Sequence, residues 1–335
     1  MFRTGACSPN FPETLLSVRT WLFRKQSRRT AEAPVIMRDV CILGAGPAGL
    51  NAALILGRCG RNVLVFDSGK PRNGVSRALH GFLTRDGTPP LELRELGRAE
   101  LGAYPTVELR QNTEVRDVRR HDGHFELFTA DGQREEARIV LIATGRIDLI
   151  PTKPGFREYY GLGVYHCAYC DGWENRNKPL VAYGCGESGA DLALDLLIWS
   201  KDVTLCTDGS SGLSDAQRKK LSDNGVRIIE DTVSGLRGNG GNIGAVTFES
   251  RDELGCEAVF FCSECVQKSP FAENLGCHLD ESGSVLCNGH AATNVPGLYV
   301  AGNVRGGVHL AIVAAAEGAE AGMAINNALH EASLR

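Results

Sequence analysis

The stretch His166-Cys-Ala-Tyr-Cys-Asp-Gly172 contains the residues best suited to redox chemistry. Two cysteines spaced as Cys167 and Cys170 can close a small disulfide and open it again as a dithiol. A helix start beside such a pair favours the thiolate form. Asp171 follows the pair directly and can give or take the proton of the departing thiolate. We therefore predict Cys167, Cys170 and Asp171 as catalytic residues of thiol–disulfide exchange; half of a zinc site and a chance pairing are the alternatives.

A second pair with the same spacing, Cys262 and Cys265, could in principle complete a zinc site. However, 91 residues separate the two pairs, far more than the ~15 to 20 of a compact zinc ribbon. We therefore expect no metal site and interpret this pair as core thiols on a strand over 258–262 that runs into a turn. Four single cysteines fall on predicted buried strands and helices, where a thiol acts as a small hydrophobe: Cys41, Cys59, Cys185 and Cys206.

A glycine-rich turn, Gly44-Ala-Gly-Pro-Ala-Gly49, follows the apolar run 40–43 and precedes the apolar segment 50–59. This strand, turn and helix pattern is typical of a dinucleotide site, in which the pyrophosphate approaches bare backbone at Gly46 and the start of the helix. Asp67 comes 23 residues after Gly44 and closes the next predicted strand. A carboxylate at that place can accept hydrogen bonds from both hydroxyls of a ribose.

The same pattern occurs again near residue 180. Gly184, Gly186 and Gly189 form the second turn, and Asp208 lies 24 residues after Gly184. The stretch 204–214 holds no Arg or Lys, so we expect a 2′-phosphate to meet Asp208 instead of a cation. This half therefore favours NADH or a second FAD over NADPH; a turn without a ligand is the alternative.

Two strand–helix–strand units must position these residues. Between them, 107–118 and 124–128 alternate in polarity, with turn signals at Asp122-Gly123 and Asp131-Gly132, and predict an antiparallel meander. A buried strand over 138–144 ends in Ala-Thr-Gly145, and 297–302 is another apolar strand before a helix over 308–328. We predict an α/β fold with two Rossmann-like, three-layer ββα dinucleotide-binding domains.

Composition narrows the classes of partner. The 335 residues carry a net charge of −4 and 12 cysteines. No basic field exists to hold nucleic acid or an anionic membrane, and no apolar run reaches the ~18 residues of a membrane span. A chain of this length with so few cysteines predicts mostly reduced thiols and a cytoplasmic location.

Residues 1–36 differ from the rest because they carry six basic residues against two acidic ones. They lack the apolar core of a secretory signal. We expect a disordered basic extension. The interpretations left open are an extension without function or outside the natural start at Met37, an organelle-targeting segment, and a partner-binding arm.

In order and spacing, GAGPAG, IATG, CAYCDG, GCGESGA and TNVPGLYVAGN before a long helix resemble the low-molecular-weight thioredoxin reductases over residues 38–330. The resemblance implies a homodimer with a discontinuous FAD domain, residues 37–149 and 264–335, and an inserted NAD(P)H-type domain, residues 150–263. It also implies that Cys170 faces the flavin, that Cys167 exchanges with a thioredoxin-like protein or a small disulfide, and that Asp171 handles protons.

We assign a set of cofactor-binding residues on the same basis. Gly302 and Asn303 are expected to contact FAD, and His309 and Leu310 to lie by the flavin ring. The full set comprises Gly44, Gly46, Pro47, Ala48, Gly49, Asp67, Val115, Ala143, Thr144, Gly145, Gly184, Gly186, Gly189, Asp208, Gly302, Asn303, His309 and Leu310.

Two positions depart from the family pattern. The basic cluster for the 2′-phosphate of NADPH is missing after Val203, and Asn303 replaces the usual Asp. The first departure leaves the electron donor open between NADH, a second flavin and a ferredoxin-type protein. A dithiol oxidase that uses the same cysteines with oxygen, and a flavin-binding protein without turnover, are the alternative functions.

Overall fold

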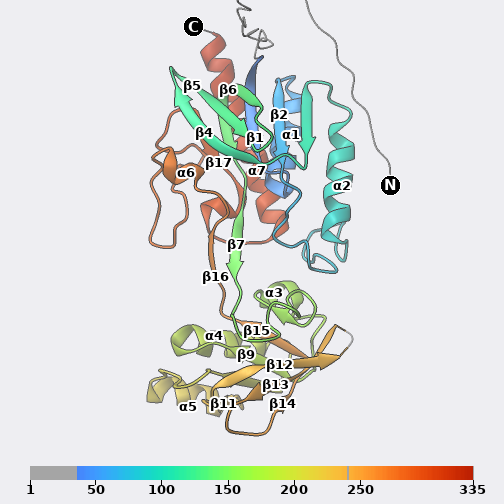
Figure 1. Cartoon of the computed structure of the whole chain (residues 1–335), viewed down its shortest axis with the longest axis vertical. Helices are drawn as coiled ribbons and strands as arrows, with labels where there is room; N and C mark the ends of the chain where they lie inside the picture. The colour runs from blue at the N-terminus through green and yellow to red at the C-terminus, as the bar shows by residue number, and fades with distance from the viewer. Residues whose placement is uncertain (1–35, 240, 335) are drawn as a thin grey trace, which may run out of the picture. The chain divides into compact units, whose positions relative to one another are not determined.

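A computed structural model describes residues 36–239 and 241–334 of the chain (Figure 1). The predicted basic extension, residues 1–36, lies outside the described residues except for Ile36. Within the described residues, no helix is long and apolar enough to cross a membrane.

The first sheet has seven strands in the order β3-β2-β1-β6-β5-β4, with β17 paired to β6. Its parallel strands are β1 (Met37–Leu43), β2 (Val63–Asp67), β3 (Val107–Gln111), β6 (Arg134–Ile142) and β17 (Leu298–Val300). Central strands of this kind are buried on both faces, which explains their continuous apolar runs. Because β17 returns to β6 from near the end of the chain, two separate stretches of sequence build this sheet (Figure 1).

The antiparallel meander comprises β4 (Val115–His121), β5 (His124–Thr129) and β6. Its turns lie at the predicted places, and Asp122 and Gly123 both have positive φ, 45° and 85°, as a tight hairpin requires. The prediction that 107–118 belongs to the meander is wrong for its first half. Asn112, with φ of 53°, breaks the segment, and β3 joins β2 in parallel at the edge of the sheet.

Helices α1 (Pro47–Arg58), α2 (Pro90–Leu101) and α7 (Ala311–Ser333) belong to the same part of the fold. Small residues let α1 and α7 approach closely: a Cβ built on Gly318 would lie 2.1 Å from the carbonyl oxygen of Ala48. The sequence pattern had not indicated α2, because its apolar face is narrow.

The second sheet has five strands in the order β11-β10-β9-β15-β8. Their bounds are β8 (Val164–Tyr165), β9 (Leu180–Tyr183), β10 (Val203–Cys206), β11 (Arg227–Ile229) and β15 (Ala258–Phe261). Helices α4 (Gly186–Leu196) and α5 (Asp215–Asp223) follow β9 and β10, and a separate three-stranded sheet holds β12 (Val233–Asn239), β13 (Asn242–Phe248) and β14 (Leu254–Gly255). Two open sheets with parallel central strands, each with a glycine turn after one of those strands, confirm the predicted α/β class.

An antiparallel pair, β7 (Arg146–Leu149) and β16 (Glu264–Gln267), connects the segments that form the two sheets. Cys262 follows the end of β15 and Cys265 lies on β16, so the predicted strand stops one residue early and a second strand begins after 263. Both thiols are half-buried, and the prediction that they are core thiols is wrong. Three short helices complete the described elements: α3 (Ala168–Asp171), α6 (Phe271–Asn274) and the 3-10 helix η1 (Gly302–Arg305).

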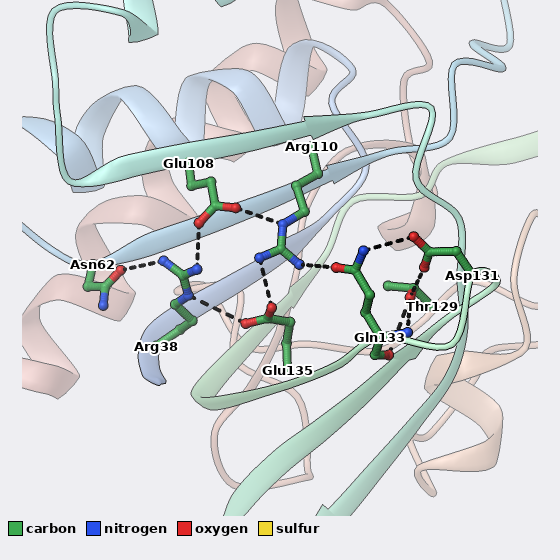
Figure 2. Close-up of polar contacts among 8 residues, drawn as sticks. All are labelled: Arg38, Asn62, Glu108, Arg110, Thr129, Asp131, Gln133 and Glu135. Carbon is green, nitrogen blue, oxygen red and sulfur yellow. Dashed lines mark hydrogen bonds and ion pairs between the residues drawn. The ribbon is translucent and has the colours of Figure 1, made fainter. Parts of the chain in front are cut away.

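A polar cluster joins β1, β3 and β6 at the amino ends of their parallel array (Figure 2). The guanidinium of Arg38 donates to Glu108, and that of Arg110 donates to Glu108 and lies 2.7 Å from Glu135. The side chain of Glu135 is 13% exposed, so these charges are paired in a partly desolvated place. The cluster lies at the edge opposite the glycine turn after β1 and stabilises the sheet.

Candidate active site

The predicted redox pair is bonded: Cys167 and Cys170 form a disulfide. Cys167 is the residue just before α3, and its Sγ accepts the backbone N–H of Cys170 at 3.1 Å. The nine other cysteines among the described residues are free thiols. Of the four single cysteines predicted to be buried, Cys41 and Cys206 are; Cys59 and Cys185 are exposed because each lies at the end of a helix.

A cavity of about 460 Å³ extends from the first glycine turn to the redox pair. Cys170 and Asp171 line it, whereas Cys167 does not. Most of the predicted flavin-site residues line the same cavity: Gly44, Gly46, Pro47, Ala48, Asp67, Val115, Ala143, Thr144, Gly145, Gly302, Asn303, His309 and Leu310. The fold therefore brings three distant stretches of sequence to one cavity wall.

The geometry of the first glycine turn fits a bound dinucleotide. A Cβ on Gly44 would lie 2.4 Å from the carbonyl oxygen of Ala143, and one on Gly49 would lie 1.8 Å from that of Gly44. Both glycines are therefore needed to close the turn, although Gly49 does not line the cavity. Gly46 has nothing within 4 Å of its built Cβ and lines the cavity. Its bare backbone leaves the space that a pyrophosphate needs at the start of α1.

Asp67 lines the cavity but is already engaged by the protein. It is 4% exposed, and Arg94 donates to both of its carboxylate oxygens at 2.8 and 2.7 Å. Arg98 donates to Oδ2 at 2.5 Å and the backbone N–H of Gly69 to Oδ1 at 2.9 Å. The arginines, both from α2, were missed because that helix was not predicted.

Asp171 combines a raised pKa with a place on a cavity wall. Burial, reinforced by the carboxylate of Glu174 and opposed by His80, raises the pKa of Asp171 to about 7. Asp171 and His80 also line a second cavity of about 510 Å³, whose other charged residues are Arg77, Glu174, Lys178 and Glu257. A carboxyl group that half-titrates near neutrality and borders two cavities can pass a proton between the redox pair and water.

A buried polar network lies beside the pair and was not predicted. Arg72 donates through Nε to Oδ2 of Asp148 at 2.8 Å, and Tyr160 donates its hydroxyl proton to the same oxygen at 2.8 Å. The Tyr160 oxygen lies 2.9 Å from Nδ1 of His166, the residue before Cys167. The Arg72 guanidinium and the neighbouring His166 lower the pKa of the Asp148 carboxyl to about 2 despite its burial. Spacing alone gives no signal for such a network, since its members come from separate segments.

The second glycine turn does not line the cavity that extends from the first glycine turn to Cys170. A Cβ on Gly184 would lie 2.5 Å from Sγ of Cys262, and one on Gly189 would lie 2.6 Å from the carbonyl oxygen of Gly184. These two glycines close the turn, and Gly186, with φ of 60°, begins α4.

The expectation that Asp208 has no cation beside it is wrong. Nζ of Lys153 lies 3.0 Å from its Oδ1, although Lys153 is 55 residues away in sequence. Tyr183 donates to Oδ2 at 2.8 Å and the backbone N–H of Val233 to Oδ1 at 2.8 Å. These bonds hold the pKa of Asp208 below its usual range, with burial acting against them.

Three side chains on the meander lie close enough together to hold a metal ion. Ligand atoms of His124, Glu126 and Glu136 lie within 4.8 Å of one another. Arg134 already contacts both carboxylates, at 2.5 and 2.6 Å, so a protein cation balances their charge.

Comparison with known proteins gives consistent matches. The family model described as pyridine nucleotide-disulphide oxidoreductase matches residues 38–318. The thioredoxin reductase sirT of Leptosphaeria maculans is 29% identical over 86% of this chain and 93% of its own length. The crystal structure of HlmI is 36% identical, covers 89% of this chain and 94% of its own, and has a TM-score of 0.85. That of thioredoxin reductase from Streptococcus pyogenes MGAS5005 is 25% identical, covers 88% and 99%, and has a TM-score of 0.81.

Proposed function

Because the chain belongs to the pyridine nucleotide-disulphide oxidoreductase family and is a thioredoxin reductase-like, FAD-dependent enzyme, we propose that it reduces the disulfide of a thioredoxin-like protein or of a small molecule. The observation that carries this proposal is the placement of the Cys167–Cys170 disulfide, with Cys170 on the wall of the cavity that begins at the first glycine turn and Cys167 outside its lining. FAD bound in that cavity would supply the two electrons that open the Cys167–Cys170 disulfide.

The cysteines then divide the work. When the disulfide opens by taking up two electrons, Asp171 gives its proton to the Cys170 thiolate, and Cys167 remains a thiolate. The Cys167 thiolate attacks one sulfur of the substrate disulfide, so that a mixed disulfide forms and one substrate thiolate leaves and takes a proton from water. Asp171 then takes the proton back from Cys170, whose thiolate attacks Cys167, restores the original disulfide and releases the second substrate thiolate, which is also protonated by water.

Serine variants test these roles. Cys170→Ser should abolish disulfide reduction while the protein remains yellow, since FAD binding does not depend on the sulfur. Cys167→Ser should also lose reduction of the substrate but keep a reducible flavin. Cys262→Ser is the matched control and should keep full activity. If both pair variants retained full turnover, the assignment of the pair would be wrong.

We propose in addition that NADPH is a poor donor. Lys153 is paired with Asp208, and Arg218, which also donates to Ser211, is paired with Glu230. Because a carboxylate already balances each of these two cations, neither offers an unbalanced positive charge to a 2′-phosphate. NADH, a second flavin or a ferredoxin-type protein remain the donors that this proposal allows.

The proposal includes the domain boundaries, residues 37–149 with 264–335 for FAD and 150–263 for the second nucleotide. It is supported by the strands of the first sheet, which come from 37–142 and 298–300, and those of the second, which come from 164–261. On the resemblance described above, we also propose a cytoplasmic homodimer, and light scattering of the purified protein tests its oligomeric state.

A further inference from the structure

An imidazole nitrogen in the cavity lined by Cys170 has no hydrogen-bond partner among the described residues. His309 lies just before α7 and lines the cavity. Its Nε2 atom is buried and has no hydrogen-bond partner among the described residues. Buried polar atoms of native proteins are nearly always paired, so an orphaned one on a cavity wall indicates a ligand atom or water.

The other ring nitrogen determines the chemical form of this imidazole. Nδ1 of His309 lies 3.0 Å from Nη1 of Arg72. A guanidinium has donors and no acceptor, so Nδ1 must accept and cannot carry a proton. Burial, together with the charges of Arg72 and Arg146, lowers the pKa of His309 to about 4. At neutral pH the ring is therefore uncharged and its single proton is on Nε2, which is a donor.

Arg72 is held so firmly that this tautomer is enforced. Its Nε and Nη2 atoms both donate to the carboxylate of Asp148, whose side chain is 3% exposed. Tyr160 and Ser263 donate to the same carboxylate, at 2.8 and 3.2 Å. The guanidinium consequently has one orientation, with Nη1 directed at His309.

The same contacts locate His309 at the redox end of the cavity. Asp148 connects through Tyr160 to His166, which directly precedes Cys167. The first glycine turn lies at the other end of the cavity, where Arg94 donates both to Asp67 and to the carbonyl oxygen of Ala45. A flavin dinucleotide that reaches both ends must place its ring, the redox-active part, at the end where Cys170 and His309 lie.

We propose that His309, fixed as its Nε2–H tautomer by Arg72 and Asp148, donates a hydrogen bond to an acceptor atom of the flavin ring and raises the reduction potential of the bound cofactor. This inference rests on the proposed function. The ring acceptors gain negative charge on reduction, so a donor held beside them stabilises the reduced form more than the oxidised form.

The test measures the two-electron midpoint potential of bound FAD by equilibration with a reference dye. His309→Phe keeps an aromatic ring but removes the donor, and its potential should become more negative. A tenfold change in the ratio of affinities for reduced and oxidised FAD corresponds to about 30 mV. His309→Gln keeps an N–H donor and should restore most of the difference. His330→Asn, a change at an exposed site in the last turns of α7, is the matched control and should leave the potential unchanged.

Nitrogen-15 NMR of histidine-labelled protein provides an independent measurement on the unaltered chain. His309 should be the Nε2–H tautomer from pH 6 to 8, and its N–H resonance should shift when the apoprotein binds FAD. Equal potentials in the wild type and His309→Phe, or an Nδ1–H tautomer, would overturn the inference. If His309→Phe does not fold, the tautomer and its FAD-dependent shift decide. A wild-type protein that binds no FAD would instead refute the proposed function.

Discussion

At the scale of single residues, Asp171 is the group whose chemistry depends most on its surroundings. An aspartate in water is ionised at neutral pH and cannot donate a proton. Here burial is the main cause that raises the pKa of Asp171 to about 7, with Glu174 adding to the rise and His80 opposing it. The fold therefore converts an ordinary carboxylate into an acid that works near neutrality.

We predict that the rate of disulfide opening falls as the pH rises through about 7, because Asp171 is a proton donor only below that value. Asp171→Asn should remove this dependence and lower the rate about 100-fold or more, in line with the loss of general acid catalysis. Single-turnover kinetics from pH 5.5 to 9 measure both effects.

The neighbours of Asp171 offer a sharper version of the same experiment. Glu174→Gln removes a like charge, so the midpoint of the pH profile should move to lower pH. His80→Gln removes a group that favours ionised Asp171, so the midpoint should move to higher pH. Glu257→Gln changes another carboxylate of the second cavity that is not among the causes of the Asp171 shift. Shifts in the same direction for Glu174→Gln and His80→Gln would contradict the assignment of Asp171 as the titrating acid.

At the scale of elements, the start of α1 combines two kinds of glycine. Gly46 has extended backbone, with φ of −80° and ψ of −176°, which any residue can adopt, and its built Cβ meets nothing. Gly49 has no such room, because its built Cβ lies against Gly44. One glycine keeps space for a ligand, and the other lets the turn close.

We therefore predict that one variant loses FAD binding and the other loses stability of the apoprotein. Gly46→Val should leave the apoprotein folded but fill the pyrophosphate space, so that FAD is lost together with the stability that binding adds. Gly49→Ala should destabilise the apoprotein itself by about 1 to 3 kcal/mol through overpacking. The ratio of FAD to protein and urea unfolding of the apoproteins separate the two, and Gly46→Val protein purified with a full complement of FAD would disprove this placement.

The polar cluster at the amino ends of β1, β3 and β6 is predicted to serve stability alone (Figure 2). Glu135→Gln leaves Arg38 and Arg110 short of a counter-charge in a partly buried place, which should cost about 1 to 3 kcal/mol. Urea unfolding measures the loss, while flavin reduction should be unchanged because the cluster lies away from the cavity. Glu253→Gln, in the exposed pair with Arg237, is the control and should not change the unfolding midpoint measurably.

At the scale of the whole molecule, the charges beside the second glycine turn bear on which donor can reduce the flavin. The second sheet carries a complete glycine turn, yet Asp208 beside it is bonded to Lys153, Tyr183 and Val233. A doubly charged 2′-phosphate would have to separate the Lys153 pair or lie beside a carboxylate, and either costs free energy.

We predict that NADPH reduces the flavin at least about tenfold more slowly than NADH, which corresponds to about 1.4 kcal/mol. Stopped-flow absorbance at equal nucleotide concentrations measures the ratio of the two rates. Because Lys153→Gln leaves the charge of Asp208 without its counter-ion, this variant should not raise the rate with NADPH. Rapid reduction by micromolar NADPH that depends on Lys153 would show that this lysine binds the 2′-phosphate. If neither nucleotide reduces the flavin, a ferredoxin-type protein becomes the donor to test.

The sequence by itself determined what depends on near neighbours. The Cys167–Cys170 spacing predicts a bond because two intervening residues keep the sulfurs within reach, and the two glycine turns are encoded by strand, turn and helix patterns within about 25 residues. Continuous apolar runs predicted the buried parallel strands. These local features were sufficient for the α/β class and for the glycine turn of the cavity wall, whereas Gly302, Asn303, His309 and Leu310 were expected there only from the family resemblance.

Only the tertiary structure decided which charges meet. Arg94 with Asp67, Lys153 with Asp208, and Arg72 with Asp148 and His309 are contacts between residues 27 to 237 positions apart. No spacing rule covers such distances, because they depend on strand order and on where connecting segments fold back. The same long-range packing buries Asp171 and fixes the tautomer of His309, so it determines the proton chemistry of residues whose positions alone were readable from the sequence.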